Sequence, residues 1–258
     1  MPRNLEYINK MNQRAKNKIR LYVEAALCPN AVVELSPDDS HYLCNVMRLT
    51  EGHVLGCFNS TGEYECSIVE AHKKHCRIKV IGKVREAHAV PDIWLLFAPL
   101  KKDKTDFVIE KATELGVRTI VPIITRNTMS DKPRIERFIA QAKEASEQCE
   151  RTDIPHIVKA ETLEKILSSW PEERILFFMD ESLQGADCVS VFSDFSKKAA
   201  AILVGPEGGF TSEEKKLLDS LPFVRGINLG PRILRAETAA CAALAVWQAV
   251  VGDWIRGE

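Results

Sequence analysis

Two short turns rich in glycine and proline lie near the C-terminal end of the sequence, each directly after an apolar run. They are Gly205–Gly209 (Gly-Pro-Glu-Gly-Gly) and Gly230–Arg232 (Gly-Pro-Arg). Glycine lets backbone N–H and C=O groups approach a ligand closely because it has no Cβ atom. In an open α/β sheet, ligands bind at the loops that leave the carboxyl ends of the strands. Two such turns could therefore build one pocket.

The spacing of these glycines narrows the class of ligand. The dinucleotide fingerprint Gly-x-Gly-x-x-Gly is absent, and so is the ATP-binding pattern Gly-x4-Gly-Lys-Ser/Thr. A glycine-rich loop taken alone is also consistent with a tight turn that binds nothing. If the turns bind a ligand, it belongs to another class.

Both turns are predicted to connect a strand to a helix. Ala200–Val204 is typical of a buried strand, and Thr211 with Glu214 has the Ser/Thr-x-x-Glu spacing that caps a helix start. The apolar run 223–229 and a helix beginning near Ala236 frame the second turn in the same way. Upstream, strands alternate with helices from Ile93 onward, which predicts a doubly wound, mostly parallel sheet.

The first part of the chain follows a different pattern. Residues 19–84 contain short predicted strands separated by turn residues, which favours a small β-barrel. One helix interrupts them, opened by Ser36 with Pro37 in its first turn. Charged residues and a proline between Arg85 and Asp92 indicate a domain boundary.

Several motifs carry a resemblance to one family. The segments 203–210 and 229–239 resemble the paired signature of the RsmE-type ribosomal RNA uridine N3-methyltransferases, members of the SPOUT superfamily of S-adenosylmethionine (SAM) enzymes. The similarity extends upstream through Lys111–Val117, Glu147–Cys149 and His41–Arg48, so it covers nearly everything from about Arg20 to the end.

The resemblance implies an α/β fold in two domains: a small N-terminal PUA-like RNA-binding β-barrel over residues 19–86 and a SPOUT-type knotted parallel-sheet domain over residues 87–258. Residues 1–18 fall outside it and are interpreted as a flexible extension. It also implies a homodimer that uses SAM and methylates N3 of a uridine in small-subunit (16S) ribosomal RNA, free or within the assembled 30S particle.

The resemblance assigns the SAM pocket to the two turns and their flanks. SAM is a sulfonium, so its pocket needs apolar walls, backbone hydrogen bonds and few cations near sulfur. Asp180 is a further candidate for the lining, and a packed loop without a ligand is the alternative interpretation. The expected cofactor-binding residues are Met179, Leu203, Gly205, Pro206, Gly208, Leu229, Gly230, Ile233 and Leu234.

Methylation of uridine N3 requires removal of the imide proton, by a base or by stabilisation of the anion. Arg235 is the candidate for holding negative charge on the uracil oxygens because its guanidinium stays charged. Glu237 or Glu207 could accept the proton. For Glu237, stabilisation of a helix N-terminus is an equally good interpretation.

Basic residues in the loops are candidates for contact with RNA phosphates. Each also has a simpler interpretation, a solvated loop or, for Arg48, a cation near the end of a helix. The candidates are Arg48, Lys101, Lys102, Lys104, Arg126 and Arg232.

Composition fits a globular protein of the cytoplasm. The formal net charge of −1 argues against binding of nucleic acid over the whole surface. The eight cysteines show no C-x-x-C pair, so we expect free thiols, no metal site and no disulfide framework. No apolar stretch is long enough for a membrane span, and the first residues lack a secretory signal. Two other functions remain open, a SPOUT methyltransferase for transfer RNA or a ribose 2′-hydroxyl, and a non-catalytic RNA-binding assembly factor.

Overall fold

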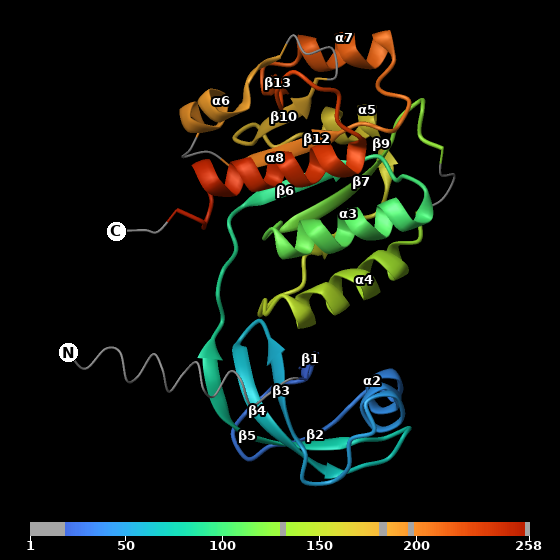
Figure 1. Cartoon of the computed structure of the whole chain (residues 1–258), viewed down its shortest axis with the longest axis vertical. Helices are drawn as coiled ribbons and strands as arrows, with labels where there is room; N and C mark the ends of the chain where they lie inside the picture. Colours follow the sequence, from blue (N-terminus) through green and yellow to red (C-terminus); the bar gives the residue numbers. More distant parts are fainter. Residues whose placement is uncertain (1–18, 130–132, 181–184, 196–198, 256–258) are drawn as a thin grey trace, which may run out of the picture. The chain divides into compact units, whose positions relative to one another are not determined.

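The computed structural model describes residues 19–129, 133–180, 185–195 and 199–255. The predicted extension, residues 1–18, lies outside them. The chain divides into two compact units, residues 1–89 with 146–153 and residues 90–145 with 154–258 (Figure 1).

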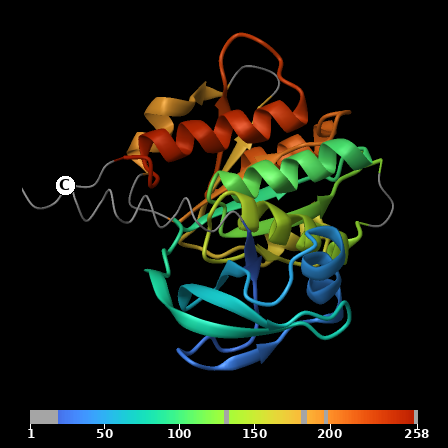
Figure 2. The ribbon, with the colours of Figure 1, turned by 60° about the horizontal axis from the view of Figure 1, so that its bottom comes forward.

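The first unit is built on a five-stranded curled sheet (Figure 2). The strands lie in the order β1-β3-β4-β5-β2, with β1 parallel to β3 and the other neighbours antiparallel. Alternate residues of β4 face the core, as a half-buried strand requires. The strands are β1 (Arg20–Tyr22), β2 (Val32–Glu34), β3 (Val54–Asn59), β4 (Gly62–Glu70) and β5 (Arg77–Glu86).

The predicted helical insertion is confirmed. Helix α2 (Pro37–His41) continues into a π-helical turn, η1 (Tyr42–Val46). Ser36 is its N-cap, and the Ser36 hydroxyl accepts a hydrogen bond from the Asp39 backbone N–H at 3.1 Å. Arg48 follows this helix with a φ of 56° and an exposed side chain.

A segment from far beyond the predicted boundary, residues 146–153, belongs to the first unit. The Arg20 guanidinium donates to the backbone carbonyls of Ser146, Glu147 and Arg151 at 3.0, 2.8 and 2.8 Å. It also forms an ion pair with Glu63 at 3.1 Å. The Arg20 side chain thus provides hydrogen bonds for three carbonyl groups of this segment. A sequence pattern could not predict these contacts.

The second unit contains the predicted parallel sheet, in the order β11-β13-β10-β12-β6-β7-β8, with β9 paired to β7. Every neighbouring pair is parallel. From β6 the chain winds first toward β7 and later, through β10, β12 and β13, to the other side, so the doubly wound prediction is confirmed. The strands are β6 (Ile93–Phe97), β7 (Thr119–Ile124), β8 (His156–Ile157), β9 (Glu161–Thr162), β10 (Ile175–Met179), β11 (Ala186–Asp187), β12 (Ala200–Val204) and β13 (Val224–Asn228).

Helices cover both faces of this sheet. The helices α3, α4, α6 and α8 share one hydrophobic cluster with it, and α5 and α7 share the other. The trefoil knot implied by the resemblance stays a prediction. The helices are α3 (Lys102–Glu114), α4 (Ile135–Gln148), α5 (Leu163–Ser168), α6 (Cys188–Asp194), α7 (Ser212–Ser220) and α8 (Ala236–Val250).

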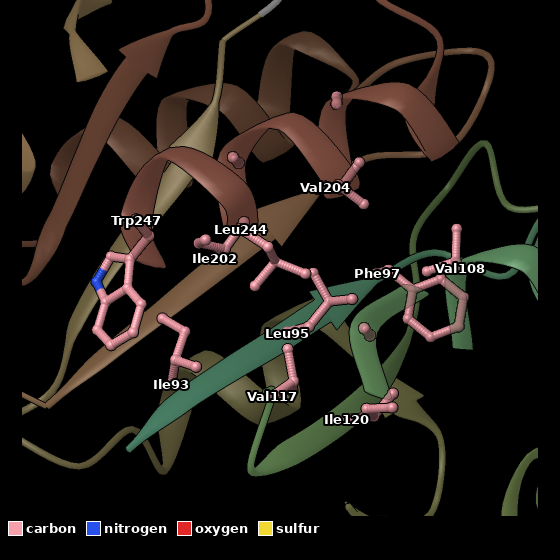
Figure 3. Packing of buried hydrophobic residues seen from close by; sticks show 14 of the residues in the cluster. Ile93, Leu95, Phe97, Val108, Val117, Ile120, Ile202, Val204, Leu244 and Trp247 are labelled. Atoms are coloured by element: carbon pink, nitrogen blue, oxygen red, sulfur yellow. The ribbon is translucent and has the colours of Figure 1, made fainter. Parts of the chain in front are cut away.

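Figure 3 shows the packing of α8 on the sheet, where Leu244 and Trp247 face Ile202 of β12 and Ile93 of β6. A polar residue near the C-terminal end of this helix has a structural role. The fully buried Gln248 amide donates to the Leu115 carbonyl, the C-cap of α3, at 2.6 Å. This hydrogen bond links the ends of two helices that pack side by side (Figure 1).

Candidate functional site

A pocket of about 490 Å³ opens at the carboxyl ends of β10, β12 and β13. It lies beside the point where the winding of the sheet reverses, the usual place for a ligand in such a fold. Six residues predicted to bind the cofactor line it. They are Met179, Gly205, Pro206, Leu229, Ile233 and Leu234.

Three predicted cofactor residues do not line this pocket. Leu203 is fully buried in the sheet core, where strand residues alternate between the two faces. Gly208 and Gly230 lie in the two turns and shape the backbone there. Gly230 adopts a φ of 102°, which an L-residue with a side chain rarely reaches.

The first turn is held by contacts that the sequence did not indicate. The Asn127 side-chain amide, from the loop after β7, donates to the carbonyls of Gly208 and Gly209 at 3.1 and 3.0 Å. A Cβ atom on Gly205 would lie 2.9 Å from the Phe210 ring. The hydrogen bonds from Asn127 and the close approach of the Phe210 ring therefore restrict movement of the turn.

The capping box predicted at the start of α7 is present, and its Glu214 carboxylate also binds the loop after β7. The Thr211 hydroxyl accepts from the Glu214 backbone N–H, and the Glu214 carboxylate accepts from the Thr211 N–H at 2.8 Å. The other oxygen of this buried carboxylate accepts from the Arg126 backbone N–H at 2.9 Å. Glu214 thus fixes two neighbouring loops at once.

The second turn is held by Asn228, the last residue of β13. The Asn228 side-chain oxygen accepts from the Gly230 backbone N–H at 3.2 Å, and its amide donates to the Gly185 carbonyl. Leu229 and Ile233 line the pocket on either side of this turn. The Ile233 side chain is 74% exposed, so it is available to cover a ligand.

The strongest electrostatic feature of the pocket is Lys104, in the first turn of α3. Its ammonium forms ion pairs with Glu207, in the first glycine turn, and with Glu237 Oε1, in the first turn of α8, at 3.4 Å for the latter. The two candidate proton acceptors are therefore brought to one cation. The other oxygen of Glu237, Oε2, is buried and has no hydrogen-bond partner among the described residues.

This arrangement changes the proton affinity of two groups. The hydrogen bond from Lys104 lowers the pKa of Glu207, with further lowering by the charges of Lys101 and Arg235. The same hydrogen bond raises the pKa of Lys104, and Glu237 adds to the rise. Both groups are therefore charged at neutral pH.

Two arginines predicted to act here lie at the pocket. Arg235 is the N-cap residue of α8, and its exposed side chain lines the pocket together with that of Arg232. A further pair was not predicted. Asp180, at the end of β10, lines the pocket with a side chain only 8% exposed and pairs with Lys215 of α7 at 3.0 Å.

The other basic candidates are not among the residues that line this pocket. The Arg126 side chain is exposed and faces Glu164 at 3.7 Å, and Lys101 is exposed in the loop before α3. Arg48 belongs to the first unit. Within the described ranges no group of three metal-binding side chains occurs, and no helix is long and apolar enough to cross a membrane.

Two family models match the chain. Residues 87–248 match an RNA methyltransferase domain, and residues 35–81 match the PUA domain of RNA methyltransferases.

Curated relatives and solved structures agree with these models. The chain is 35% identical over 228 residues to the ribosomal RNA small subunit methyltransferase E of Rickettsia conorii, covering 88% of this chain and 93% of the relative. A structure of the enzyme of that name from Neisseria gonorrhoeae, bound to SAM, superposes with a TM-score of 0.82 at 25% identity and covers 92% of this chain and 99% of its own. A Legionella pneumophila protein, also solved with bound SAM, gives a TM-score of 0.83 at 30% identity, with 91% and 98% covered.

Proposed function

We propose a specific reaction for this chain, which belongs to the RNA methyltransferase family whose curated members are called ribosomal RNA small subunit methyltransferase E and is a SAM-dependent methyltransferase of ribosomal RNA. We propose that the atom it methylates is N3 of one uridine in the small-subunit RNA, and that the 490 Å³ pocket holds the methyl donor.

The observation that carries this proposal is the combination at one pocket of apolar walls, two glycine turns, two exposed arginines and a lysine that binds Glu207 of the lining and Glu237 outside it. The pocket has the size of a small-molecule site. Met179, Leu229 and Leu234 provide an apolar lining, and the Gly205 backbone is free of a side chain. These features suit SAM, which when bound supplies an electrophilic methyl group.

The protein's own residues would then stabilise the negative charge that develops on the uracil base. The Arg235 guanidinium presents several donors at the pocket, where it would hold the negative charge that develops on a uracil oxygen as the imide proton leaves. Arg232, beside it, is placed to meet an RNA phosphate.

Of the two candidate acceptors for the imide proton, Glu237 is the better one. Its Oε1 is held by Lys104, whereas its Oε2 has no partner among the described residues. Because Oε2 is buried and Glu237 does not line the pocket, this oxygen would accept the proton only once the side chain turns toward the base. Glu207 is less suitable because Lys104 lowers its pKa, which weakens it as a base. Lys104 would thus be a positioning residue for Glu237.

We propose further that the enzyme works in the cytoplasm as a homodimer on small-subunit RNA, either free or within the assembled 30S particle. Half-buried side chains of α8, including Cys241, Ala245 and Val246, support a subunit interface. The eight cysteines are free thiols, which suits a reducing compartment. Light scattering of the purified protein tests the dimer, and activity on 30S particles against free RNA tests the substrate.

The decisive experiment is incubation of the protein with SAM and 30S particles that lack the modification, followed by mass spectrometry of the released nucleosides. We expect 3-methyluridine. A ribose-methylated nucleoside, or activity on transfer RNA instead, would point to another SPOUT specificity. Binding of RNA without SAM binding or methyl transfer would identify a non-catalytic assembly factor.

A further inference from the structure

A second pocket, of about 410 Å³, lies at the same edge of the sheet, between the loop after β6 and the first turns of α3 and α4. Its floor is apolar, because the buried side chains of Leu100 and Phe138 face it. Its other lining residues include Lys102, Arg134 and Arg137, so the site combines an apolar floor with a basic rim.

The charge of this rim is only partly neutralised. Arg137 is bound by the Asp106 carboxylate through two hydrogen bonds, one of them at 3.0 Å. Neither Lys102 nor Arg134 forms an ion pair with any residue in the described ranges. The N-termini of α3 and α4 add positive potential at the same place. The pocket therefore favours an anionic ligand.

The floor of the pocket is fixed before any ligand arrives. The buried Thr105 hydroxyl accepts from the Leu100 backbone N–H at 2.8 Å and donates to the Leu100 carbonyl at 2.9 Å. The Phe138 ring packs against Phe97, with 6.3 Å between the ring centroids. A preformed apolar surface under a cationic rim suits a planar base with a phosphate attached.

The first turn of α3 separates this pocket from the first one. Lys102 lines the second pocket and Lys104 the first, and residues two apart on a helix point to opposite sides. An RNA strand that places a uridine at Lys104 therefore has a second site two residues away in the chain, on the other side of the α3 N-terminus.

We propose that the second pocket binds one nucleotide of the substrate RNA other than the methylated uridine. The base lies against Leu100 and Phe138, and its phosphate is held by Lys102 and Arg134. This inference rests on the proposed function for its choice of RNA as the ligand. It assigns a recognition site to a part of the chain that the reaction itself does not use.

The first test reverses the charge of the rim. The double variant Lys102→Glu, Arg134→Glu should weaken binding of small-subunit RNA about tenfold or more and flatten its dependence on salt concentration by the equivalent of one to two phosphate contacts. The affinity for SAM should be unchanged. The matched control is Lys159→Glu, Lys216→Glu, which makes the same change of charge at exposed positions of the same unit.

Equal RNA affinity in the double variant and the wild type would overturn the site. So would an equal loss in the control, because that loss would reflect general surface charge. Affinity is measured by fluorescence anisotropy, so the test does not depend on methyl transfer. If the wild type binds RNA through this pocket but makes no 3-methyluridine, the proposed reaction fails and the binding site stands.

The second test asks whether a base enters the pocket. A series of substrate RNAs, each with one abasic nucleotide near the target uridine, should contain one position whose loss weakens binding about tenfold. In the Lys102→Glu, Arg134→Glu variant the same abasic position should have a smaller effect, because the two changes act on one contact. A series with no sensitive position, or with fully additive losses, would overturn the assignment of a base.

Discussion

The two pockets at the carboxyl edge of one sheet differ in the balance of their charges. In the first, two lining carboxylates, Asp180 and Glu207, face the lining cations Lys104, Arg232 and Arg235, so its charges are nearly balanced. In the second, Asp106 is the one carboxylate among the lining residues and faces three cationic side chains. A balanced pocket suits a ligand that itself carries a positive sulfonium, and a basic one suits a polyanion.

The two pockets also differ in how their walls are made. Glycine turns form the first, fixed by hydrogen bonds with the side chains of Asn127 and Asn228, whereas helix N-termini form the second. Added atoms should therefore damage the shape of the first pocket, as Gly205→Ala tests below, whereas in the second pocket altered charges should weaken binding. In the first pocket altered charges should affect the reaction more than the binding of SAM.

The largest effect is expected from Arg235→Ala. If Arg235 holds charge that develops only during the reaction, kcat should fall by about 10²–10³ while the Kd for SAM stays nearly constant. Single-turnover kinetics and calorimetry measure the two quantities. Arg232→Ala is the matched control in the same pocket, and it should raise KM for RNA with kcat retained. A loss of SAM binding in proportion to the loss of turnover would refute the role.

Glu237→Gln should have the next largest effect, because the amide keeps the shape but cannot accept the imide proton. We expect kcat to fall by about 10²–10³ at neutral pH. Glu213→Gln, at the exposed start of α7, controls for the loss of a carboxylate at a helix N-terminus. If both variants lose stability alike and neither loses turnover, Glu237 only stabilises its helix.

Gly205→Ala tests whether the first pocket depends on the shape of its turn. The new Cβ atom would lie 2.9 Å from the Phe210 ring, so the ring or the turn must move. Overpacking of this kind costs roughly 1–3 kcal/mol. If SAM binds only the undistorted turn, this cost corresponds to a loss of roughly 5- to 150-fold in SAM affinity.

Two further variants sharpen the Gly205 experiment. Gly82→Ala serves as the control, because a Cβ atom there meets no atom within 4 Å. Adding Phe210→Leu to Gly205→Ala should restore part of the affinity by making room for the methyl group. Unchanged SAM binding in Gly205→Ala would mean that this turn does not shape the donor site.

Much of the sheet and the turns could be predicted because the signals are local. The capping box at Thr211 and Glu214 spans four residues, and the apolar run 200–204 is a buried strand where it was expected. The strands β8, β9 and β11 were missed because two residues are too few to show a period.

The contacts that organise the site could not be predicted in the same way. Asn127 and Gly208 lie 81 residues apart in the chain, and Lys104 and Glu207 lie 103 apart. Only the parallel order of the strands brings them to one edge. Sequence reasoning therefore placed Lys104 among cations for RNA, and the structure shows which carboxylates it binds.

Lys104→Met gives the smallest and most specific of the expected changes. Because the hydrogen bond from Lys104 is the main cause of the lowered pKa of Glu207, removing it should let that pKa rise toward its ordinary value. Lys101→Met removes a cation that acts on Glu207 through its charge alone, so it should give a smaller rise in the pKa of Glu207. Carbon-13 NMR of the Glu207 carboxyl group measures both.

The lowered pKa of Glu207 also determines how the stability of the fold depends on pH. A depressed pKa in the folded state means that Glu207 stabilises the fold above its unfolded pKa and that this contribution disappears as the pH falls through the folded pKa. The raised pKa of Lys104 extends its own contribution up to alkaline pH. The difference in melting temperature between wild type and Lys104→Met should therefore be present at neutral pH and vanish in acid. A difference that persists unchanged at acid pH would show that Lys104 stabilises the fold by packing instead of by its ion pairs.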